Sequence, residues 1–204
     1  MIGESSPPST GRRSGAETRA AAQRVALELF TSKGYESTSL REIADALGIN
    51  KASLYYHFRS KEDILQSLFA QRGTETEELL RWLQDQPAGP HLLERTVLRW
   101  VDSFSADKLR GIRFVLANPL LGRADGDRIS TGLNRLVDAL VPLLATPSGA
   151  DVVLLRMAVL SINAAVEAAA GTDVGDDEIV EAAHRAAVAL LGQLSGPAAQ
   201  VSGH

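Results

Sequence analysis

The stretch Thr38–Ile64, TSLREIADALGINKASLYYHFRSKEDI, decides how this chain is interpreted. Thr38 or Ser39 is expected to cap a helix here, and Ser39 precedes a glutamate by three residues, the spacing of a capping box. Gly48 ends that helix after about two turns. Asn50 is a preferred N-cap for a second short helix over Lys51–Phe58. Two short helices joined by a tight turn predict a helix-turn-helix.

Helices are also expected on both sides of this stretch. Ser14 begins a helix through the same three-residue spacing to a glutamate, and Gly34 ends it. Ser60 begins a longer helix that runs through Leu83 and breaks over residues 86–90, where glycine and prolines gather. The N-terminal third is therefore expected to hold three helices, followed by a fourth that continues into the rest of the chain.

The remaining sequence has helical periodicity and shows no two-residue alternation or hairpin signal. Pro142 is expected to kink or end one of the later helices. The further helices are expected at Leu92–Phe104, Lys108–Ala117, Asp127–Leu144, Asp151–Ala170 and Asp176–Leu194. The predicted fold class is all-α, with about nine helices.

Composition and motifs exclude several classes of protein. The 204 residues contain no cysteine, which excludes disulfides, thiolate metal sites and a cysteine nucleophile. No phosphate-binding loop, dinucleotide fingerprint or hydrolase motif occurs, so no enzyme, cofactor or metal is predicted. The apolar stretch Val152–Ala170 carries Arg156, Asn163 and Glu167, so a membrane span is not expected. Without an apolar leader in Met1–Gly15, we expect a cytoplasmic protein.

Charge is distributed unevenly along the chain. The net charge is −4, but residues 1–62 hold nine basic and seven acidic residues, while residues 63–204 hold twelve and eighteen. The N-terminal third thus carries +2 and the remainder −6. A mildly basic region on an acidic body indicates a local phosphate-binding surface.

The second short helix has one buried and one outward side. Leu54 and Phe58, four residues apart, form its expected apolar pair. The outward positions are then Lys51, Ser53, Tyr55, Tyr56 and His57. The alternative is that Tyr55 or Tyr56 packs into the core of the domain.

Residues Arg19–Leu68, about a quarter of the chain, resemble the DNA-binding domain of the TetR family of transcriptional regulators. The segments that carry the resemblance are ALELFTSKGY (26–35), TSLREIADALG (38–48) and KASLYYHFRSKEDI (51–64). It implies a helix-turn-helix domain over residues 16–62 and a C-terminal helical domain over residues 63–194 that binds an effector and dimerises. We expect residues 1–15 and 195–204 to be disordered tails.

The resemblance also implies which residues contact DNA. They are expected to reach phosphates, base edges or the groove wall, and they are Thr38, Ser39, Arg41, Lys51, Ala52, Ser53, Tyr55, Tyr56, His57 and Lys61. Lys51 and Lys61 are the strongest candidates for phosphate contacts. Arg41 has an equal alternative, an ion pair with Asp45 one turn along the helix.

The last two helices are rich in alanine and apolar on much of their surface, so we expect them to form a homodimer interface. The alternative is that they pack only within one chain. The residues expected to line an effector pocket are Trp100, Phe104, Phe114, Met157, Asn163 and Glu167, with ordinary core or solvent-facing positions as the equal alternative. A mostly apolar pocket would favour a hydrophobic or amphipathic effector.

These inferences combine into one hypothesis. The chain is predicted to be a homodimeric repressor that binds a pseudo-palindromic operator in double-stranded DNA and leaves it when a small molecule binds. One alternative is an activator or architectural DNA-binding protein that has no effector. A second is a helical small-molecule-binding protein or enzyme with a vestigial helix-turn-helix.

Overall fold

The computed structural model describes residues 14–119, 121, 126–144 and 146–194. This part of the chain forms nine α-helices and one short 3-10 helix and contains no strand, which confirms the predicted fold class. The chain divides into two compact units, Met1–Ile64 and Leu65–His204. The expected tails lie outside the described residues, except for Ser14 and Gly15, which already belong to the first helix.

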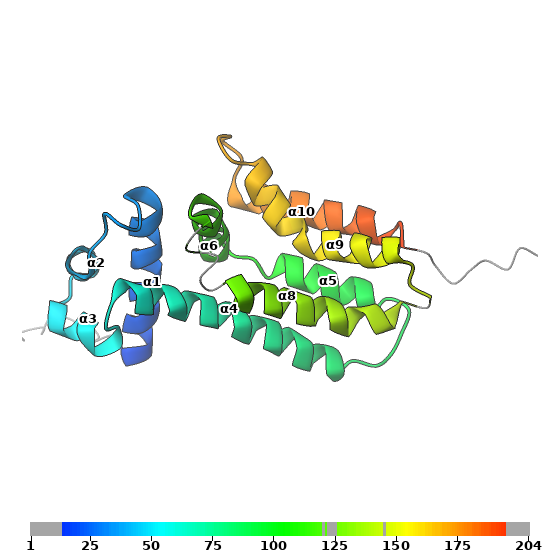
Figure 1. The fold of residues 1–204 in the computed structure, drawn as a ribbon, viewed down its shortest axis with the longest axis horizontal. Helices are drawn as coiled ribbons and strands as arrows, with labels where there is room; N and C mark the ends of the chain where they lie inside the picture. Colours follow the sequence, from blue (N-terminus) through cyan, green and yellow to red (C-terminus); the bar gives the residue numbers. More distant parts are fainter. Residues whose placement is uncertain (1–13, 120, 122–125, 145, 195–204) are drawn as a thin grey trace, which may run out of the picture. The chain divides into compact units, whose positions relative to one another are not determined.

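The N-terminal unit is built from three helices (Figure 1), namely α1 (Gly15–Ser32), α2 (Leu40–Leu47) and α3 (Lys51–His57). Each begins at an N-cap whose side chain accepts a hydrogen bond from the first turn: Ser14, Ser39 and Asn50. Ser14 and Ser39 form complete capping boxes with the glutamates three residues later. The three helix starts expected from the sequence are therefore confirmed.

Gly48 makes the turn between α2 and α3. Its backbone has a φ of +67°, in the left-handed region that a Cβ disfavours. The amide of Ile49 then donates to the carbonyl of Ala44, at 3.1 Å, and closes the end of α2. Phe30, Ile43 and Leu54, from the three helices, are fully buried together with Phe58. This core holds α3 against α1 and α2 with one side free.

The C-terminal unit is also helical, and α4 (Lys61–Gln84) runs across the boundary between the units. Its other elements are α5 (Leu92–Asp102), α6 (Ala106–Ala117), α8 (Gly126–Leu140), η1 (Val141–Leu143), α9 (Gly149–Ala168) and α10 (Asp176–Leu191). Pro142 lies in η1, directly after α8 ends, because a proline cannot continue the hydrogen-bond pattern of an α-helix.

The core of this unit lies where α9 packs against α10, α5 and α6. By length and composition α9 is able to cross a membrane, but its Leu155, Val159 and Ile162 are buried within the unit. The indole N–H of Trp100, on α5, donates to the carbonyl of Val159 at 3.2 Å. A side chain of α5 thus forms a hydrogen bond with a buried backbone carbonyl of α9. Helix α9 is the central helix in the core of this unit.

Candidate nucleic-acid interface

Helix α3 presents its aromatic residues outward, as its spacing indicates. Leu54 and Phe58 have no exposed surface, whereas Tyr56 is 86% exposed and Tyr55 is 44% exposed. The alternative in which a tyrosine packs into the core is therefore wrong for both. Lys51 and Ala52, in the first turn of α3, are also exposed. The free side of α3 consequently begins with a cation and ends with two phenols.

Side chains of α3 that are exposed or half-buried also contact one another. The ammonium of Lys51 lies 5.2 Å from the centroid of the Tyr55 ring, and the rings of Tyr56 and His57 pack edge to face at 5.1 Å. Ser53 is half-buried, and its amide donates to the Asn50 side chain at 2.7 Å. A cation, two phenolic hydroxyls and an imidazole on one short helix are donors suited to phosphate oxygens and base edges.

Helix α2 contributes two of the expected residues at its exposed start. The hydroxyl of Ser39 donates a hydrogen bond to the carboxylate of Glu42 at 2.9 Å, and Ser39 is the N-cap of α2. Its first role is therefore that of a helix cap. Arg41 is exposed, and its Nε lies 3.8 Å from Asp45, a loose ion pair between two solvated side chains. An exposed ion pair of this kind contributes little to the stability of the protein, so Arg41 can break it to contact DNA at a small cost in free energy.

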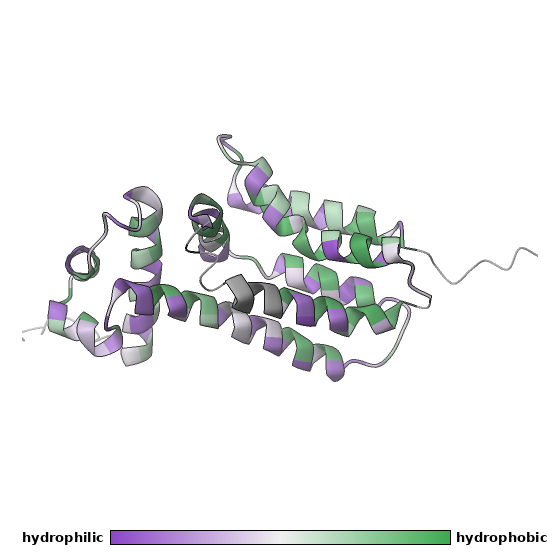
Figure 2. Cartoon of the chain, viewed as in Figure 1, coloured by the Kyte–Doolittle hydropathy of each residue, from purple (hydrophilic) through white to green (hydrophobic). Residues whose placement is uncertain are grey.

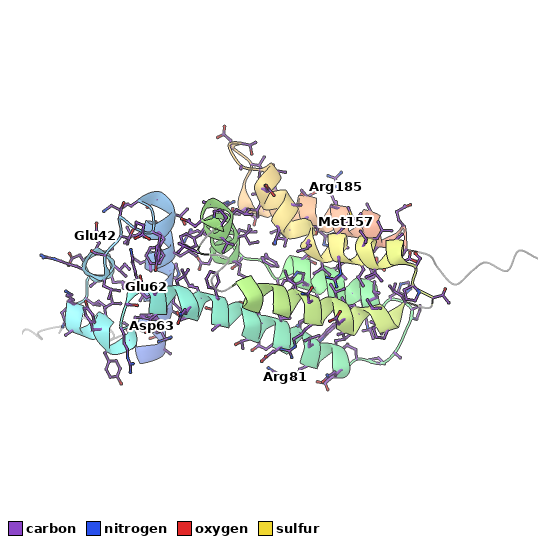
Figure 3. All side chains as sticks on the ribbon, viewed as in Figure 1. Glu42, Glu62, Asp63, Arg81, Met157 and Arg185 are labelled. Carbon is purple, nitrogen blue, oxygen red and sulfur yellow. The ribbon has the colours of Figure 1, made fainter. Side chains whose placement is uncertain are left out.

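Glu42 is an acidic residue of α2, and it stays ionised (it is marked in Figure 3). The hydrogen bond from Lys33, followed by those from the backbone and side chain of Ser39, lowers the pKa of Glu42 to about 2. Lys33, which lies just beyond α1, is therefore tied to α2 by a charge-assisted contact.

The structure corrects the expectation for Thr38. Its side chain is 3% exposed, and its hydroxyl lies 2.9 Å from the carbonyl of Gly34, to which it donates. A buried hydroxyl that donates a hydrogen bond to a carbonyl of the loop after α1 is not available to DNA. Thr38 therefore closes the connection between α1 and α2, and we remove it from the expected contacts.

Lys61 also differs from the expectation, because its ammonium points into the unit. The side chain is 19% exposed, and its Nζ lies 2.9 Å from the carbonyl of Tyr35 and 3.4 Å from the Glu36 carboxylate. It also lies 4.3 Å from the centroid of the Tyr35 ring. Lys61 thus fastens the loop after α1 to the start of α4, and it is not a free phosphate donor.

Tyr35 completes this internal connection. Its hydroxyl donates to the carboxylate of Glu62 at 3.0 Å, and its ring packs edge to face on Phe30 at 4.9 Å. Burial, followed by the Glu62 carboxylate, raises the pKa of the Tyr35 phenol. The pKa of Glu62 is lowered, first by its hydrogen bond with Ser60. The neutral phenol and the ionised carboxylate therefore form a matched donor and acceptor.

Two arginines of the N-terminal unit were not among the sequence-predicted residues. Arg59 follows α3 directly and is exposed. Arg19, on α1, donates from Nη1 to the carbonyl of His57 at 2.9 Å. No local pattern could have identified Arg19, because its partner lies 38 residues away.

The residues expected around an effector separate into two groups. Trp100, Phe104 and Phe114 are buried, and the first two pack edge to face with 5.2 Å between ring centroids. Met157, by contrast, is 49% exposed, and Glu167 is exposed on the same helix (Met157 is marked in Figure 3). These two do not line an interior pocket, because they lie on the outer side of α9. Asn163 is half-buried.

Helices α9 and α10 pack against each other, and Figure 2 shows hydrophobic residues along both. Some of the apolar residues on each helix remain exposed. On α9 these residues recur every three or four positions along one side. We call this side the α9 stripe, which consists of Val153, Met157, Leu160, Ala164 and Ala168. The exposed small apolar residues of α10 are Ala182, Ala186, Val188 and Ala189. Exposed apolar stripes of this kind are typical of surfaces that contact a partner.

Comparison with known proteins places this site in a family. Residues 24–68 match the family model described as bacterial regulatory proteins, tetR family. The chain is 30% identical over 105 residues to the HTH-type transcriptional repressor BepR of Brucella suis, covering 50% of each chain. It is 36% identical over 91 residues to the HTH-type transcriptional regulator AcrR of Shigella flexneri, covering 40% of this chain and 42% of AcrR. The match spans about half the length of these relatives, and both are named as regulators rather than enzymes.

The fold has a counterpart among solved structures. The ketosteroid transcriptional regulator KstR2 of Mycobacterium tuberculosis superposes with a TM-score of 0.65 at 18% identity, covering 88% of this chain and 95% of KstR2. The likeness extends over both units and shows that the whole helical fold is shared, while the family model identifies the segment around α2 and α3. Over residues 24–68, which include α2 and α3, the chain is therefore similar to the TetR family of bacterial regulatory proteins.

Proposed function

We propose that this protein is a cytoplasmic transcriptional repressor that binds an operator in double-stranded DNA through α3. The observation that carries the proposal is the free side of α3, on which Lys51, Tyr55 and Tyr56 are exposed above a fully buried Leu54. A helix held in this way can enter the major groove while its lysine and phenols reach phosphates and base edges. Arg41 and Ser39, at the start of α2, supply further donors beside it.

We propose that the operator is read by a homodimer. One seven-residue helix contacts few bases, so a second copy on a symmetric dimer is needed for specificity. The α9 stripe and the exposed alanines of α10 supply a surface for self-association. Alanines let helices approach closely, and a two-fold axis would bury the same residues of both chains.

We further propose that a small apolar or amphipathic molecule binds within the C-terminal unit and releases the operator. Trp100, Phe104 and Phe114 are the large buried side chains that support this proposal. Ser161, on α9, adds a polar group: among the described residues its hydroxyl is the buried side-chain oxygen without a hydrogen-bond partner. An unsatisfied hydroxyl in an apolar core is an anchor for one polar group of a ligand.

The DNA-binding proposal is tested by fluorescence anisotropy with duplex DNA from the region upstream of the gene, over a series of salt concentrations. Lys51→Ala is expected to weaken binding and to reduce the salt slope by about one unit. Tyr56→Ala is expected to weaken binding about tenfold with the slope retained. Arg81→Ala, which removes a positive charge from the C-terminal unit, is the control (Figure 3). Equal effects of all three substitutions would contradict a contact through α3.

The effector proposal is tested by a thermal-shift screen of apolar and amphipathic small molecules, followed by anisotropy with the same DNA. A ligand that raises the melting temperature is expected to weaken operator binding, because it must favour the state that binds DNA less well. A protein that binds DNA but is stabilised by none of the compounds would favour an activator or architectural role without an effector.

A further inference from the structure

Arg19, on the first turns of α1, makes two contacts with the end of α3. Its Nη1 donates to the carbonyl of His57 at 2.9 Å. Its guanidinium carbon lies 4.3 Å from the centroid of the Phe58 ring. The two contacts hold the same guanidinium at the last residue of α3 and at its C-cap.

The end of α3 needs such a partner. With seven residues, α3 is too short to be stable by itself, and the final carbonyls of a helix lack amide partners within it. A guanidinium at this end satisfies one of these carbonyls and interacts favourably with the negative end of the helix dipole. The Phe58 ring is fully buried, so it offers a fixed face on which the guanidinium stacks.

We propose that Arg19 is a positioning residue that sets the orientation of α3 for DNA binding. It acts through α3: the carbonyl of His57 and the ring of Phe58 directly follow Tyr55 and Tyr56, the exposed phenols. Without this contact at the end of α3, the two phenols would sample several orientations. Fixing them in one orientation on DNA would then cost conformational entropy, and this cost would weaken binding. This inference rests on the proposed function of α3, and it assigns to Arg19 a role distinct from that of the residues that contact DNA.

The competing role for an exposed arginine near a DNA-binding helix is a direct phosphate contact, and two measurements on Arg19→Ala separate the roles. The first is amide hydrogen exchange of the DNA-free protein, read at Phe58, whose amide donates to the carbonyl of Leu54 at 2.9 Å. The second is the salt slope of DNA binding. A positioning role predicts about tenfold faster exchange at the end of α3, about tenfold weaker binding and an unchanged slope.

Arg19→Lys keeps a positive donor but loses the planar guanidinium, so it is expected to recover part of the exchange protection and of the affinity. Arg24→Ala, at another exposed arginine of α1, is the matched control and is expected to leave the exchange of α3 unchanged. If Arg19→Ala fails to fold, the lysine variant carries the test, with a smaller change in the same direction.

Unchanged exchange in α3 overturns the proposal, whether or not DNA binding weakens. Weaker binding with a salt slope reduced by about one unit and unchanged exchange identifies Arg19 as a phosphate contact instead. If the wild-type protein binds no DNA, the proposed function fails. The exchange measurement still decides, in that case, whether Arg19 fastens α3.

Discussion

Replacing Leu160 with glutamate tests the dimer through the α9 stripe. Val153, Met157 and Leu160 remain about half exposed, at 55%, 49% and 40%. Burying a large apolar side chain completely contributes about 1.5–3 kcal/mol, so burying the remaining half contributes about 1 kcal/mol for each. The three together supply about 3 kcal/mol per chain, or about 6 kcal/mol for a symmetric pair.

Leu160→Glu removes about 1 kcal/mol of this burial per chain and leaves a carboxylate in an apolar contact, which costs about 1 kcal/mol or more. Two-fold symmetry doubles the effect to about 4 kcal/mol, which corresponds to an increase of about a thousandfold in the Kd of the dimer. Operator affinity is expected to fall with it, because a monomer reads only one half-site.

Sedimentation equilibrium over a range of protein concentrations measures this Kd. The matched control is Leu143→Glu, because Leu143, on η1, has the same 40% exposure as Leu160 but lies outside the α9 stripe. Equal Kd values for the two variants, or a wild-type protein that stays monomeric at all concentrations, would refute the interface and the estimate built on it.

Three further predictions concern the N-terminal unit. Lys61→Ala is expected to lower the melting temperature of the protein and to leave the salt slope of DNA binding nearly unchanged, because its ammonium binds the carbonyl of Tyr35; a slope reduced by a full unit would restore its phosphate role. Ser39→Ala is expected to cost about 1 kcal/mol in a urea titration, because α2 loses its N-cap, and a loss below about 0.3 kcal/mol would show that the cap is dispensable. The lowered pKa of Glu42, about 2, predicts stability that is present above the unfolded-state pKa near 4.5 and is lost as the pH falls toward 2. Lys33→Met removes the largest cause of this shift, so it should flatten the acid side of a melting-temperature profile, and a profile unchanged by the substitution would contradict the assignment.

The sequence alone was sufficient for the features that depend on neighbours within one or two helical turns. The caps at Ser14, Ser39 and Asn50 and the left-handed turn at Gly48 follow from short-range hydrogen bonds and backbone sterics. The outward side of α3 follows from the four-residue spacing of its buried pair. These features were sufficient to predict the all-helical class and the helix-turn-helix.

The tertiary structure alone decided the roles of residues whose partners are distant in sequence. Thr38 and Lys61 look like free polar side chains beside a DNA-binding helix, yet their hydrogen bonds go to backbone carbonyls of the unit. Met157 lies in an apolar helix, α9, that is buried on one side and exposed on the other. Which side of α9 is buried depends on its packing against α10 and α5. Arg19 reaches α3 across 38 residues. A periodic pattern shows which residues share a side of a helix, but which side is covered depends on contacts formed only when the chain folds.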